Sequence, residues 1–166
     1  SCDRHWEHLS STRMSEPKVT LITVHFNQPD LTCALLESIR QQDYRNVEVI
    51  VVDNASEIND EHLFRECFPE VVFVRSERNL GFAGGNNIGL RFALAQPGTA
   101  YAWLLNNDTI VARDALSALV ATHRATTDAG IVGSTLLFYS EPDTVQALGG
   151  ATFDFFGMSI ALTLKH

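Results

Sequence analysis

Residues 19–26 read VTLITVHF, a continuous run of β-branched and apolar side chains that ends in a histidine and a phenylalanine. A strand buried on both faces of a parallel sheet has this pattern, whereas a half-exposed strand alternates apolar and polar side chains. Directly after the run, Pro29 and Asp30 open a stretch in which the apolar residues have helical spacing. The run therefore predicts the first strand of a strand–helix unit.

The same alternation continues along the chain. Strands are predicted at 47–53, 71–76, 100–106 and 130–139, and helices at 61–68, after the glycine-rich stretch 79–89, and at 112–124. Strands that alternate with helices pair in parallel. The expected fold class is α/β, a mostly parallel sheet with helices on both faces. The less regular tail, 145–166, could form short extra strands.

The bulk properties are those of a globular protein. The chain has 166 residues, 45% of them apolar, 19% charged, and a formal charge of −8. This acidity, without any basic run, argues against nucleic-acid binding. The three cysteines are far apart and form no CxxC pair, which suggests a reducing, cytoplasmic setting without disulfides or structural zinc. No apolar stretch reaches the ~18 residues of a membrane span.

The first thirteen residues differ from the rest of the chain. They are polar, lack any period, and precede Met14. We interpret 1–13 as a flexible extension or tag-like segment, and 14–166 as the folded domain.

Polar side chains follow four of the predicted strands at the point where each strand ends. They are His25 to Asn27, Asp53 and Asn54, Arg78 and Asn79, and Asn106 to Asp108. In a parallel α/β sheet, ligands bind outside the carboxyl ends of the strands. Each of these residues alone is also a common turn or cap residue, but four such ends together favour a binding site.

The glycines do not fit the common phosphate-binding motifs. The first strand is followed by HFNQPDL, so the glycine-rich turn of a dinucleotide-binding fold is absent, and no P-loop sequence occurs. The glycines follow the third predicted strand instead, at positions 81, 84, 85 and 89. Close packing of a helix against the sheet is an alternative reason for them.

Three motifs, IVVDNAS (50–56), NLGFAGGNNIG (79–89) and LLNNDT (104–109), occur in this order. Together they resemble family 2 glycosyltransferases of the GT-A fold, and most closely the bacterial rhamnosyltransferase-like members. The resemblance covers about 19–156 and corresponds to the N-terminal, donor-binding part of such an enzyme. It implies inverting transfer of a sugar from a nucleoside-diphosphate donor, a UDP- or dTDP-sugar, to a polysaccharide or lipid-linked acceptor.

The resemblance also implies roles for individual residues. Asp53 would contact the base or ribose, and Arg78 and Asn79 would hold the nucleoside. The usual Asp-x-Asp motif reads Asn106-Asn107-Asp108 here, which leaves Asp108 as the ligand of Mg²⁺ or Mn²⁺ and leaves strict metal dependence open. Asn86 stands where the family's glycine-rich loop usually carries an arginine. The full expected substrate-binding set is Phe26, Asn27, Asp53, Arg78, Asn79, Gly81, Asn86, Asn106 and Asn107.

No catalytic base is assigned from the sequence. The acidic residues after Asp108 lie in no motif of the family; they are Asp114, Asp128, Glu141, Asp143 and Asp154. Family members continue into a region that supplies the acceptor site and the base, so we expect the base beyond His166 and a C-terminally incomplete domain. This chain alone is then expected to bind donor without transferring sugar.

Two other functions stay open. A sugar nucleotidyltransferase shares the α/β form but needs a glycine- and basic-rich loop after the first strand, which HFNQPDL does not provide. A non-catalytic module that binds nucleotide sugars would fit the absence of a base. The expected location is cytoplasmic, with peripheral association to the inner face of the plasma membrane through a missing C-terminal part.

Overall fold

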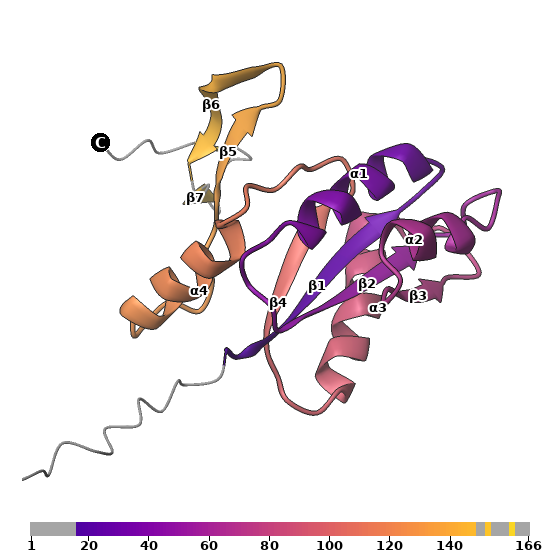
Figure 1. Cartoon of the computed structure of the whole chain (residues 1–166), viewed down its shortest axis with the longest axis horizontal. Coiled ribbons are helices and arrows are strands. Elements are labelled where there is room, and N and C mark those ends of the chain that lie inside the picture. Colours follow the sequence, from indigo (N-terminus) through magenta and orange to yellow (C-terminus); the bar gives the residue numbers. More distant parts are fainter. Residues whose placement is uncertain (1–15, 149–151, 154–159, 162–166) are drawn as a thin grey trace, which may run out of the picture.

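A four-stranded parallel sheet forms the centre of the molecule (Figure 1). The computed structural model describes residues 16–148, 152–153 and 160–161. The strands are β1 (Lys18–His25), β2 (Val47–Asp53), β3 (Val72–Arg75) and β4 (Thr99–Asn106), in the order β3-β2-β1-β4. All three neighbouring pairs are parallel, so the four carboxyl ends lie at one edge. The expected α/β fold class is confirmed.

Helices cover both faces of this sheet. On one face, α1 (Pro29–Arg40) and α2 (Glu61–Cys67) pack on the central strands, and α4 (Ala115–Ala125) packs near the start of β1. On the other face lies α3 (Gly81–Ala95). The two central strands are therefore apolar on both sides, which explains their continuous runs of Val, Ile and Leu.

Alternation along each central strand divides the core into two halves. Leu21, Val49 and Val51 pack with Leu35 of α1 and Phe64 of α2. The intervening residues of the same strands turn to α3; these are Ile22, Ile50 and Val52, packed with Ala93. This period of two also decides which side chains reach each side of the strand ends.

The predicted strand at 130–139 is wrong as a fifth strand of the sheet. Only Thr135–Phe138 form a strand, β5, and it pairs antiparallel with β6 (Glu141–Leu148) in a separate hairpin. The two residues between β5 and β6 are enough for an antiparallel hairpin, whereas a parallel pair would need a crossover of a dozen or more residues. The tail does form short extra strands, because β7 (Thr152–Phe153) pairs with β8 (Ile160–Ala161).

Other boundaries differ slightly from the prediction. The helix expected at 112–124 begins at Ala115, and the helix expected at 61–68 ends at Cys67. The proposed extension at 1–13 lies outside the described residues. In the part of the chain that the structure describes, no helix has the length and apolar character needed to cross a membrane.

The glycine-rich stretch is part of α3 itself, not only a loop before it. The helix begins at Gly81, which has a φ of 69°, and contains three more glycines. A Cβ atom at Gly85 would lie 2.7 Å from Cγ1 of Val24, and one at Gly89 would lie still closer to Cγ2 of Ile22. Gly85 and Gly89 therefore allow α3 to pack closely against β1, as the packing alternative proposed.

Replacing Gly89 by alanine is expected to lower the free energy of unfolding by about 1–2 kcal/mol, because the added methyl group overlaps the fully buried Ile22. The better helix propensity of alanine offsets up to ~1 kcal/mol of the cost of overpacking. Urea unfolding of the two proteins measures the difference. Gly130→Ala is the matched control, since nothing lies within 4 Å of a Cβ there. Equal losses in both variants would contradict the close packing of α3.

Candidate functional site

A cleft of about 440 Å³ opens at the carboxyl edge of the sheet. Residues from the ends of β1, β2 and β4 and from the start of α3 surround it. Its lining residues are Val24, Phe26, Gln28, Asn54, Asn79, Gly81, Phe82, Asn106, Asn107 and Asp108. Six of the ten residues expected at the site therefore meet in one cleft: Phe26, Asn79, Gly81, Asn106, Asn107 and Asp108.

Asn54 organises the wall of this cleft between β2 and α3. Its Nδ2 donates to Oδ1 of Asn79 at 2.9 Å and to the carbonyl oxygen of Gly81 at 3.1 Å. Its Oδ1 accepts a hydrogen bond from the backbone N–H of Leu80 at 2.9 Å. One amide thus fixes the loop that leads into α3. The predicted site set omitted Asn54, although its place directly after β2 was a signal for it.

Asp53 does not line the cleft, although Asp53 and Asp108 were expected to face it together. The Asp53 side chain is buried, with Nη1 of Arg75 2.8 Å from Oδ2 and the backbone N–H of Ser56 donating to Oδ1 at 2.9 Å. The physical reason is the period of the strand, because Val49, Val51 and Asp53 all turn to the side of α1 and α2. Through this ion pair with Arg75, the Asp53 carboxylate links the end of β2 to β3.

Three other expected residues also lie outside the lining of the cleft. Asn27 has a φ of 53°, and its Oδ1 accepts a hydrogen bond from the backbone N–H of Glu57 at 2.8 Å, which ties the end of β1 to the loop after β2. Arg78 is exposed. Asn86 is buried within α3 and donates to the carbonyl oxygen of Phe82 at 3.0 Å. Asn27 and Asn86 thus hold backbone segments beside the cleft through hydrogen bonds, without lining it.

Asp108 contributes the one carboxylate among the lining residues of the cleft. The amides of Asn106 and Asn107 stand beside it in the chain, so the available donors are oxygen atoms, which suit Mg²⁺ or Mn²⁺. Within 16–148 and the two short strands that follow, no cluster of three His, Cys, Asp or Glu side chains could hold a metal ion. A cation bound at Asp108 would therefore take further ligands from the substrate and from water.

The acidic residues considered as bases lie away from this cleft. Asp114, Asp128, Glu141 and Asp143 are not among its lining residues, and Asp114 stands at the N-terminus of α4. Asp154 lies outside the described residues. The lining of the cleft therefore offers no second carboxylate that could act as a base beside Asp108.

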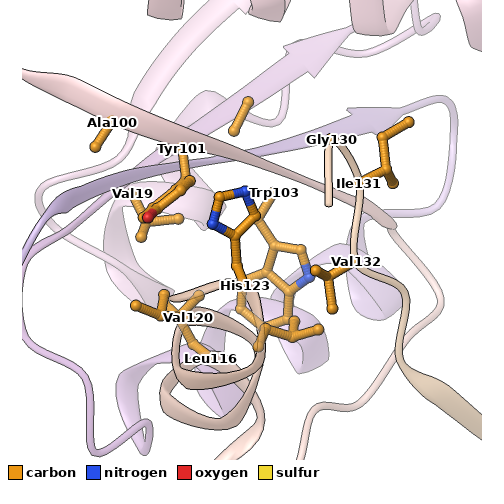
Figure 2. A pocket seen from close by; sticks show the side chains of 12 residues that line it. Val19, Ala100, Tyr101, Trp103, Leu116, Val120, His123, Gly130, Ile131 and Val132 are labelled. Atoms are coloured by element: carbon orange, nitrogen blue, oxygen red, sulfur yellow. The ribbon is translucent and has the colours of Figure 1, made fainter. Parts of the chain in front are cut away.

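A second hollow, of about 470 Å³, lies along β4 and α4 (Figure 2). Apolar and aromatic side chains form most of its wall, among them Trp103 and Val120, and the rings of Tyr101 and His123 meet edge to face at 4.9 Å. It shares no residue with the cleft at the strand ends. The groups suited to a charged ligand are thus in the cleft, not in this hollow.

A parallel α/β sheet with a polar cleft at its carboxyl edge and a glycine-rich helix on one wall fits the GT-A fold of glycosyltransferases. The solved structures agree. A mannosyltransferase from Pyrobaculum calidifontis, solved with GDP-Man and Mn²⁺, is 28% identical with a TM-score of 0.54, over 64% of this chain and 32% of its own. Staphylococcus aureus TarS in complex with UDP-GlcNAc has a TM-score of 0.56 at 19% identity, over 71% and 38%, and supports the fold alone.

The chain belongs to glycosyl transferase family 2, whose family model matches residues 20–157. An uncharacterized protein of Mycobacterium tuberculosis is 36% identical over 122 residues, which are 72% of this chain and 42% of that protein. A low-salt glycan biosynthesis hexosyltransferase of Haloferax volcanii is 26% identical over 58% of this chain and 34% of its own length. The matched part of the chain thus spans less than half the length of each of these two relatives.

Proposed function

We propose that this chain is the donor-binding part of an inverting glycosyltransferase. It would bind a nucleoside-diphosphate sugar, with UDP or dTDP as the nucleotide, in the cleft at the strand ends. The observation that carries the proposal is the meeting of Asn106, Asn107 and Asp108 with the first residues of α3 around one cleft. The similar mannosyltransferase structure holds GDP-Man, which supports a nucleotide sugar as ligand.

The start of α3 favours an anion in the cleft. Gly81 and Phe82, the first two residues of this helix, both line it. The first N–H groups of a helix have no partner within the helix, and its dipole places partial positive charge there. The N–H of Gly81 already donates to Oδ1 of Asn79 at 2.8 Å, so the dipole and the N–H groups that follow Gly81 are what would attract an anion. A diphosphate is the part of the donor that such a helix end would attract.

The opposite wall of the cleft suits a divalent cation. Asp108 and the neighbouring amides supply oxygen donors, and Mg²⁺ or Mn²⁺ is commonly held by one or two carboxylates together with substrate phosphates. The similar mannosyltransferase contains Mn²⁺. When bound, the cation would offset the negative charge that develops on the diphosphate as the sugar leaves.

Transfer also needs a base that takes the proton of the acceptor hydroxyl, and a positioned base typically contributes ~10²–10⁴-fold. The cleft contains no carboxylate other than that of Asp108, which the proposal assigns to the metal. We therefore propose that this chain binds donor but does not transfer sugar by itself. The proposal extends to a saccharide or lipid-linked acceptor and to a cytoplasmic location, peripheral to the membrane, both carried over from the family resemblance.

We expect UDP or dTDP to bind this chain at least ~10-fold more tightly with Mn²⁺ or Mg²⁺ than with EDTA, which is about 1.4 kcal/mol. The reason is that the cation would join Asp108 to the diphosphate oxygens. Isothermal titration calorimetry in the two buffers measures the ratio. Uridine and thymidine are the matched controls, because without a diphosphate they should show no metal effect.

The outcomes separate the possible functions. Equal affinity with Mn²⁺ and with EDTA would show that the Asn-Asn-Asp form works without a metal. Binding by this chain and no sugar transfer by the full-length gene product would instead favour a non-catalytic nucleotide-sugar-binding module.

A further inference from the structure

A buried threonine connects the cleft to the core beneath it. Thr32 lies in the first turn of α1 and is fully buried. Its Oγ1 lies 3.3 Å from Nδ2 of Asn107, 2.9 Å from Nδ1 of His25 and 3.2 Å from the carbonyl oxygen of Gln28. Asn107 lines the cleft, so this hydroxyl joins a cleft residue to His25 at the end of β1 and to Gln28 directly before α1.

The Thr32 hydroxyl has a single hydrogen to donate, and this limits how the side-chain amide of Asn107 can be oriented. A threonine hydroxyl donates one hydrogen bond and accepts two. Its hydrogen can go to the carbonyl oxygen of Gln28 or to Nδ1 of His25. In either case only a lone pair remains for Asn107, and in the structure the amide does present its NH₂ group to Thr32, with Nδ2 donating to Oγ1 at 3.3 Å.

His25 supports this arrangement in each of its protonation states. The ring is buried, packs edge to face on Phe64 at 4.9 Å, and has Nε2 3.6 Å from Oδ2 of Asp60. Burial lowers the pKa of His25, while the nearby Asp53 and Asp60 carboxylates act in the opposite direction. With a proton on Nδ1, the ring donates to Oγ1 of Thr32, and the threonine hydrogen goes to the carbonyl oxygen of Gln28. With a proton on Nε2 alone, Nδ1 accepts the threonine hydrogen. Both cases leave Asn107 as the donor.

We propose that Thr32 is a positioning residue, which holds the Asn107 amide with its NH₂ group inward and its carbonyl oxygen toward the cleft. This proposal rests on the function proposed above. A carbonyl oxygen beside Asp108 adds a second oxygen donor to the side of the cleft that would hold the cation. The reversed amide would place two N–H groups there, and these repel a cation. Thr32 itself does not touch the ligand.

The first experiment compares Thr32→Val, which removes the hydroxyl at similar volume, with Thr32→Ser, which keeps it. The readout is the ratio of the Kd for UDP in EDTA to that in Mn²⁺, by calorimetry. We expect Thr32→Val to lose most of the ~10-fold metal enhancement and Thr32→Ser to retain it. A general loosening of the fold would weaken binding in both buffers alike and leave the ratio unchanged. An unchanged ratio in Thr32→Val would overturn the proposal.

The second experiment tests whether Thr32 acts through Asn107. In a double-mutant cycle, Thr32→Val should change the ratio little once Asn107 is already alanine, because the amide that it orients is gone. Equal effects of Thr32→Val in both backgrounds would count against the proposal. Thermal unfolding of each variant establishes that the folded protein is what is being compared.

The third experiment needs no ligand, so it separates failure of this inference from failure of the proposed function. The NH₂ signals of Asn107 in a ¹⁵N-labelled protein should exchange slowly with solvent, and at least ~10-fold faster in Thr32→Val than in Thr32→Ser. Equal exchange in both variants would refute the orientation of the amide. Slow exchange together with no metal effect in the wild type would refute the metal site alone.

Discussion

Replacing Asp108 by asparagine is expected to remove the effect of Mn²⁺ or Mg²⁺ on nucleotide binding. Asp108 is the one carboxylate among the residues that line the cleft, so its loss leaves only amide oxygens for a cation. With Mn²⁺ present, the affinity for UDP should fall ~10- to 100-fold, about 1.4–2.8 kcal/mol, to the level that the wild type shows in EDTA. Titration of both proteins in both buffers measures the loss.

Asp114→Asn is the matched control for this substitution. It makes the same chemical change six positions along the chain, at the N-terminus of α4 and outside the lining of the cleft. Its metal enhancement should equal that of the wild type. A metal effect that persists in Asp108→Asn would place the cation on other groups and would remove Asp108 from the proposed site.

Replacing Arg75 by alanine is expected to lower the free energy of unfolding by about 2–4 kcal/mol. The substitution leaves the Asp53 carboxylate, 1% exposed, without the guanidinium 2.8 Å away. Breaking a buried ion pair costs about 3–5 kcal/mol, and the 36% exposure of the Arg75 side chain reduces this figure. Arg75 also donates to the carbonyl oxygen of Ser56, so the loop after β2 loses a second contact. Urea unfolding measures the change.

Arg65→Ala is the control for Arg75→Ala. Arg65 forms an exposed pair with Glu61 one helical turn away, at 2.7 Å. Pairs of this kind contribute about 0.3–0.5 kcal/mol. Arg65 also donates to the carbonyl oxygen of Val71 at 3.3 Å, so each variant loses an ion pair and a bond to a backbone carbonyl, and the loss should be smaller for the exposed pair. Similar losses in the two variants would mean that the Asp53 pair contributes no more than a surface pair, and that the junction of β2 and β3 is held by apolar packing.

The sheet could be predicted because strands that are buried on both faces have nearly continuous runs of apolar residues. β1 and β2 have apolar or β-branched residues at consecutive positions over most of their length, and their helices follow with a different period. The strand at 130–139 was wrong because a short apolar run does not specify its partner. β5 is exposed along its whole length, and among the residues that the structure describes it pairs with the strand that follows it.

The site could be predicted in position but not in every residue. Polar strand ends in a parallel sheet indicate a cleft, and Asn106 to Asp108 do line one. Asp53 and Asn54 are neighbours in the chain, and only the geometry at the end of β2 shows that Asn54 reaches the cleft. The contact of Thr32 with Asn107 joins residues 75 positions apart, so no local pattern could reveal it.

The close packing of α3 on β1 has a consequence for which donors such a domain could accept. Gly85 and Gly89 let the helix axis lie near the sheet, and Gly81 and Phe82 at its first turn form one wall of the cleft. The opposite wall, Asn106 to Asp108, is anchored to the sheet itself through β4. The distance between the walls therefore depends on the absence of two methyl groups between α3 and β1. Larger side chains at these two buried positions would move α3 away from β1 and widen the cleft, although neither position is among the residues that line it.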